Sequence, residues 1–124
     1  MSLRYEIEYS QNLINVKTSG VFDYLNAYEM WKDIATTCEA NNCFQILGVS
    51  LLSEPMPALD AYDQVNLLAS AGISPKHRIA WVAGNNELIE NLRLAETVFK
   101  QRSSQNVRIF ETVHDGKRWL QHGD

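Results

Sequence analysis

The sequence predicts an α/β domain in which an N-terminal strand hairpin precedes strands that alternate with helices. Near the N-terminus, apolar and polar residues alternate in two short runs separated by Gln11 and Asn12. Such alternation is typical of antiparallel strands with one buried face. Residues 44–52 and 78–84 are instead mostly apolar, and a segment with helical periodicity follows each. That pattern indicates parallel strands covered by helices.

The hairpin is expected to pair residues 5–10 with residues 13–20. The side chains expected on its buried face are Tyr5, Ile7, Tyr9, Ile14 and Val16.

A first helix is expected from Asp23, whose carboxylate can accept free backbone N–H groups, to about Asn41. Apolar residues recur in it at spacings of three and four, so they share one face. The expected members are Tyr24, Tyr28, Trp31, Ala35 and Cys38, widened by Met30 and Ile34. An aromatic stripe of this kind is more often core than binding site. Buried Trp and Tyr need hydrogen-bond partners, however, so this face can border a pocket.

The segment after strand 44–52 predicts a second helix. Pro55 and Pro57 end the strand, and Pro57 suits the first turn of a helix, where its missing N–H costs nothing. Gly72 is expected to end this helix. Its expected inward face comprises Ala58, Tyr62, Val65, Ala69 and Gly72, with Leu59 and Leu68 beside them.

The C-terminal half continues the alternation with strand 78–84, a third helix, strand 107–111 and a short fourth helix. Asn85 or Asn86 is expected to cap the third helix, and Thr112 with Asp115 to cap the fourth. The residues expected to face inward from these helices are Leu88, Ile89, Leu92, Ala95, Val98, Phe99, Trp119 and Leu120.

Length and charge exclude several classes of protein. At 124 residues the chain has the size of one domain, and we expect residues 1–124 to form a single unit. Its net charge of −4 argues against a nucleic-acid partner. No run approaches the ~18 apolar residues that span a bilayer, and the first residues lack a signal pattern. We therefore expect a cytoplasmic protein that does not contact membranes.

The two cysteines do not indicate a metal or redox site. Cys38 and Cys43 lack the spacing of such sites, and the three histidines lie far away in sequence. We interpret both cysteines as reduced residues that pack as small apolar groups. No metal ion and no cofactor is expected.

The order of elements, together with the runs YEIEYS, LINVKTSG, RIAWVAG, VRIFE and KRWL, resembles the STAS domains. These are named after sulfate transporters and anti-sigma factor antagonists. The chain is most similar to the standalone bacterial branch described as SpoIIAA-like, after the stage II sporulation anti-sigma factor antagonist. The resemblance implies a mostly parallel five-stranded sheet with an N-terminal antiparallel hairpin and about four helices. It also implies a regulatory or binding role without catalysis.

Within this resemblance, antagonists are phosphorylated on a Ser or Thr in a DSSG-like loop at the start of the second helix. The corresponding segment here, VSLLSEPMPALD, contains Ser50 and Ser53 but departs from that motif. Some members of the standalone branch look like carriers of small hydrophobic molecules, which the same loop and helix would bound.

The candidate functional residues are centred on this loop. It leaves the carboxyl end of a central strand, where ligands collect in α/β sheets, and it enters a helix N-terminus that attracts anions. The candidate binding or regulatory residues are Ser50, Ser53, Asp60, Tyr24 and Trp31. The alternative is an ordinary strand–helix connection. No catalytic residue is predicted, because His77 should lie at the opposite end of its strand from Ser53.

Two functions remain open from the sequence. The first is a non-enzymatic regulatory domain that binds a partner protein, and the second is a carrier or sensor of a small apolar ligand. An enzyme with dispersed catalytic residues has no supporting motif. A homodimer through the first two helices is a further possibility.

Overall fold

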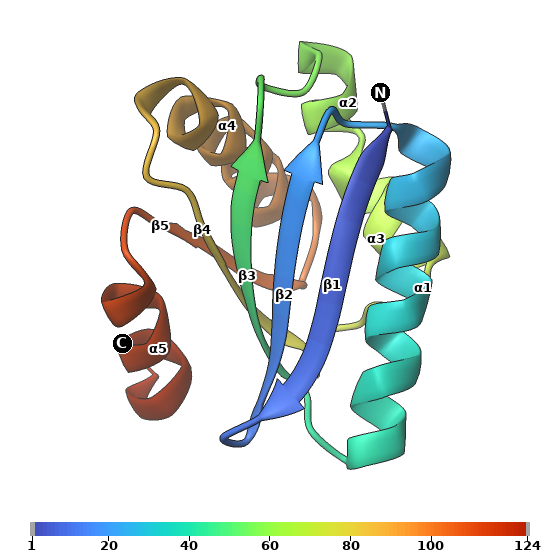
Figure 1. Cartoon of the computed structure of the whole chain (residues 1–124), viewed down its shortest axis with the longest axis vertical. Coiled ribbons are helices and arrows are strands. Elements are labelled where there is room, and N and C mark those ends of the chain that lie inside the picture. Colours follow the sequence, from blue (N-terminus) through green and yellow to red (C-terminus); the bar gives the residue numbers. More distant parts are fainter. Residues whose placement is uncertain (1, 124) are drawn as a thin grey trace.

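Five strands form one sheet in the order β1-β2-β3-β4-β5 in the computed structural model, which describes residues 2–123 (Figure 1). The strands are β1 (Leu3–Ser10), β2 (Leu13–Gly20), β3 (Gln45–Leu52), β4 (Arg78–Val82) and β5 (Asn106–Phe110). β1 and β2 pair antiparallel, and the other three pairings are parallel. The predicted α/β class and the mostly parallel sheet with an N-terminal hairpin are confirmed.

Helices cover the two faces of the sheet unequally. The helices are α1 (Tyr24–Asn41), α2 (Ala58–Tyr62), α3 (Gln64–Ser70), α4 (Asn86–Arg102) and α5 (Val113–His122). α1 contacts β1 and β2, α4 contacts β5, and α2 and α3 contact α4. α5 packs on the opposite face, against β3, β4 and β5 (Figure 1). The main core therefore lies between the sheet and α1, α3 and α4.

The hairpin turns at Gln11 and Asn12, both of which have positive φ angles. A two-residue turn of this kind matches the twist of antiparallel strands. Four of the five expected residues are buried or partly buried: Tyr5, Ile7, Ile14 and Val16. The prediction for Tyr9 is wrong, since its side chain is 42% exposed. Tyr9 lies beside the turn on the edge strand, where its hydroxyl donates to Asn12 Oδ1 (3.4 Å).

Helix α1 begins where it was predicted, because the Asp23 carboxylate accepts the N–H of Leu25 (3.1 Å). The predicted inward face is only partly right. Its buried residues are Ala27, Met30, Trp31, Ile34 and Cys38, whereas Tyr24 is 41% exposed. The small Ala27 side chain lets the first turns approach the sheet, and this orientation turns Tyr24 outward.

The predicted second helix is two short helices, with a break at Asp63. Its predicted inward face is only partly right. Leu68 is buried and Val65 partly buried as predicted, whereas Ala58, Leu59, Tyr62 and Ala69 are exposed. The buried residues are Ala61, Leu67, Leu68 and Ala71. The face differs because α2 packs on α4 rather than on the sheet. Gly72, with φ +101°, ends the segment as predicted.

The C-terminal half folds as predicted. Asn85 Oδ1 accepts the N–H groups of Glu87 and Leu88 at the start of α4. Thr112 Oγ1 accepts the N–H of Asp115 at the start of α5. Trp119 and Leu120 are buried in a second, smaller core with Leu47, Ala80 and Val82. No helix within residues 2–123 is long and apolar enough to cross a membrane.

Candidate functional site

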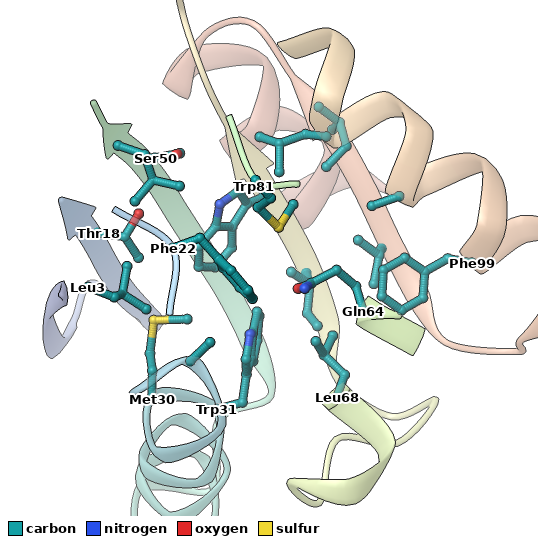
Figure 2. A pocket seen from close by; sticks show the side chains of 18 residues that line it. Leu3, Thr18, Phe22, Met30, Trp31, Ser50, Gln64, Leu68, Trp81 and Phe99 are labelled. Atoms are coloured by element: carbon teal, nitrogen blue, oxygen red, sulfur yellow. The ribbon is translucent and has the colours of Figure 1, made fainter. Parts of the chain in front are cut away.

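A cavity of about 70 Å³ lies between the helix-covered face of the sheet and α1, α3 and α4 (Figure 2). We call it the sheet–helix cavity. All five strands contribute to its walls, as do the loops that carry Phe22 and Met56. Most of the lining side chains are apolar, and the cavity is partly open to solvent.

Two tryptophans stack in the middle of this cavity. The Trp81 ring lies flat over Gly48 on the neighbouring strand, where a Cβ would overlap its Cε3 and Cζ3 atoms. Trp31 of α1 packs on Trp81 with ring centroids 5.2 Å apart. The small side chains of Ala27 on α1 and Ala95 on α4 line the same cavity. Large rigid rings beside small residues leave space that the neighbouring side chains do not fill.

One end of the cavity is polar. Thr18 and Ser50 lie directly opposite each other on β2 and β3, and their side chains are only 3% and 5% exposed. Figure 2 shows them side by side, at the end of the cavity away from Leu68 and Phe99. Neither hydroxyl has a hydrogen-bond partner within residues 2–123. Their oxygens are not among the fully enclosed unpaired atoms of that range, and both residues line the cavity.

The indole N–H groups of Trp31 and Trp81 also have no hydrogen-bond partner within the described chain. In Figure 2 the indole nitrogen of Trp81 lies on the side of the ring nearer Thr18 and Ser50. The Gln64 amide points toward the middle of the cavity, although its Nε2 donates to the Asp60 carbonyl (3.0 Å). Among residues 2–123, no charged side chain lines the cavity. This lining is therefore neutral and offers several hydrogen-bond donors.

The loop between β3 and α2 is fixed at both ends. The N–H and the hydroxyl of Ser53 both donate to the Gly20 carbonyl, at 2.9 and 3.1 Å. The Met56 N–H donates to Asn91 Oδ1 (2.9 Å), and Asn91 Nδ2 donates to the Met56 carbonyl (3.1 Å). These bonds to β2 and α4 hold the Met56 side chain against the cavity.

The structure separates the five candidate residues. Trp31 and Ser50 line the sheet–helix cavity. Ser53 is exposed and bound to the Gly20 carbonyl, Asp60 lies on α2 outside the lining, and Tyr24 is exposed. α2 has only five residues and no side-chain cap, so the anion site expected at its N-terminus has no support.

Sequence reasoning missed several residues of the cavity. Thr18 could have been found, because the alternation of β2 places it on the same face as Ile14 and Val16. A glycine inside a strand often marks the close approach of another group, and Gly48 was such a signal. The lining role of Met56 had no signal in the sequence.

His77 lies at the amino end of β4, whereas Ser53 follows the carboxyl end of the parallel strand β3. The two residues are therefore at opposite ends of the strands, as predicted. Its Nδ1 accepts the N–H of Ser74 (3.1 Å), and its Nε2 has no partner within residues 2–123. Burial lowers the pKa of this imidazole below its usual value, because it disfavours the charged form. Burial likewise raises the pKa of the Cys38 thiol to about 12. No group of three metal-ligating side chains occurs in the part of the chain that the structure describes.

In comparisons with known proteins, no family model matches this chain, and no curated protein matches it in sequence.

Proposed function

We propose that this protein binds a small, uncharged, mainly apolar molecule in the sheet–helix cavity. The observation that supports the proposal is the cavity itself, whose described lining is mainly apolar and contains no charged side chain. Ligand sites are typically concave and apolar, with a few polar groups that fix orientation. Thr18, Ser50 and the two indole N–H groups fit that description. The protein would act as a carrier or a sensor, without catalysis.

The size of the cavity limits the ligand. An engineered protein cavity of about 150 Å³ holds benzene, and the space here is about half as large. A ligand of that size therefore requires lining side chains to move. Met30 and Met56 both line the cavity, and unbranched methionine side chains adjust readily to new shapes. We expect a compact ligand rather than a long lipid chain.

Native mass spectrometry of freshly purified protein should reveal a co-purifying small mass. In parallel, a titration with benzene should change the emission of Trp31 and Trp81, which line the cavity. Trp119 lies in the core on the other face and supplies a constant background. An Ala95→Leu variant, which fills the cavity, should fold but lose the response. No bound mass and no emission change in the wild type would contradict the proposal.

A second candidate function is a regulatory domain of the STAS type that docks a partner protein. The sheet order and the N-terminal hairpin support this resemblance, although many folds host several functions. The specific observation is that Leu59 is 82% exposed and Tyr62 53% exposed on α2, next to the loop that carries the exposed Ser53. If this loop is a switch, phosphopeptide mapping of the native protein should find Ser53 modified. If Ser53 stays unmodified under all growth conditions, regulation by phosphorylation of this loop is contradicted.

A further inference from the structure

The hydroxyl groups of Thr18 and Ser50 give the sheet–helix cavity a chemical preference. We propose that its ligand is a compact neutral carbonyl compound, such as a small ketone, aldehyde or ester. The carbonyl oxygen would be bound by Thr18 and Ser50, with the Trp81 indole N–H as a third donor. This inference rests on the proposed function and names its ligand class.

The strand pairing places the two hydroxyls suitably for one shared acceptor. Thr18 and Ser50 are register partners on adjacent strands, and adjacent strands lie about 4.8 Å apart. Hydrogen bonds between hydroxyls and oxygen acceptors measure about 2.7–2.8 Å. A single oxygen between the two side chains can therefore accept from both. The ring of Trp81, which crosses from β4 over Gly48 on β3, brings its N–H toward the same end of the cavity.

The donors also determine the polarity of the ligand. An indole N–H can only donate, and a hydroxyl can donate to any acceptor. A pure hydrocarbon would leave these buried groups unpaired, which is costly. A carboxylate would need a cationic partner, because a buried unpaired charge is unfavourable, and none of the lining side chains within residues 2–123 is cationic. A neutral acceptor attached to an apolar body satisfies both conditions.

Cyclopentanone and methylenecyclopentane provide the test, since they differ mainly in whether oxygen or carbon ends the double bond. Calorimetric titration should give a dissociation constant about 3- to 10-fold lower for the ketone, the range expected for one or two net hydrogen bonds. The ketone alone should also shift the Trp81 indole N–H resonance in a ¹H–¹⁵N spectrum. A Trp81→Phe spectrum assigns that resonance.

Thr18→Val and Ser50→Ala should each reduce the preference for the ketone, because they remove a donor to its oxygen and also remove a group that the hydrocarbon leaves unpaired. Ser19→Ala is the matched control, because Ser19 follows Thr18 on β2 and successive strand side chains point to opposite faces of the sheet. Equal affinity for the two compounds in the wild type would overturn this inference and leave the proposed function standing. Binding of neither compound, with no co-purifying mass, would overturn both. A preference for the ketone that persists unchanged in both hydroxyl variants would also overturn the assignment.

Discussion

Replacing Gly48 with alanine places a methyl group where the Trp81 ring now lies. The added Cβ would overlap three atoms of that ring, which belong to a rigid side chain. The ring cannot simply lift away from the sheet, because Trp31 packs on it at a centroid distance of 5.2 Å. The substitution must therefore push Trp81 into the sheet–helix cavity or force β3 and β4 to adjust.

The expected change in stability combines two opposing effects. Overpacking a filled position costs about 1–3 kcal/mol. Replacing glycine by alanine at an unstrained position stabilises by about 0.4–1 kcal/mol, since it restricts the unfolded chain. We expect a net loss of about 0.5–2 kcal/mol for Gly48→Ala. For a domain of this size that corresponds to a decrease in Tm of roughly 2–8 °C.

Thermal unfolding followed by circular dichroism measures this loss, and tryptophan emission reports movement of the ring. Gly84→Ala is the matched control, because a Cβ at Gly84 meets no atom within 4 Å and its φ angle is not positive. That control should be neutral or slightly stabilising. Adding Gly48→Ala to a Trp81→Leu background should cost little, because the ring is absent. A Gly48→Ala protein as stable as the wild type, with unchanged emission, would refute the packing argument.

Substitutions at three further positions test other parts of the structure. Burial lowers the pKa of His77, so below pH ~6.5 the unfolded chain binds a proton at this residue that the folded state does not bind. The free energy of unfolding should therefore be highest above that pH and should fall below it by up to about 1.4 kcal/mol per pH unit. Urea unfolding across this range should show that slope, and His77→Gln should reduce it. Glu96 accepts the N–H of Ile109 at the edge of the sheet (2.7 Å), so Glu96→Ala should cost about 1–3 kcal/mol in urea unfolding while Glu96→Gln costs less. Asn91→Ala removes both hydrogen bonds to Met56 and should speed amide exchange of that loop; unchanged exchange would show that the loop is held otherwise.

The parts of the fold that the sequence predicted are those decided by local chemistry. Asp23, Asn85 and Thr112 each cap the helix that was expected after them. A cap can be read from the sequence because one short side chain binds an N–H only two or three residues away. Strands 44–52 and 78–84 were recognisable because both faces are buried, which leaves a continuous apolar run.

The errors occur where a distant element decides which side of a helix is buried. The prediction for residues 58–72 assumed one continuous helix that packs on the sheet, whereas α2 packs on α4 instead. Similarly, the apolar residues predicted to face inward from Tyr24 onward have the correct helical spacing, but the buried face of the helix is rotated away from Tyr24. Its orientation depends on how closely Ala27 approaches the sheet, which no local pattern specifies. The sequence left open that the face carrying Trp31 borders a pocket, and Trp31 lines the cavity.

The cavity itself depends on residues that are far apart in the chain. Trp31 and Trp81 are fifty positions apart, and they meet only because Gly48, on a third element, leaves room for one ring to lie on the sheet. Thr18 and Ser50 become a pair only through the parallel register of β2 and β3. A one-residue shift in either strand would turn one hydroxyl to the opposite face. The sheet–helix cavity is thus a consequence of sheet register, whereas the candidate residues proposed from the sequence were centred on the loop after β3, which has the more conspicuous sequence.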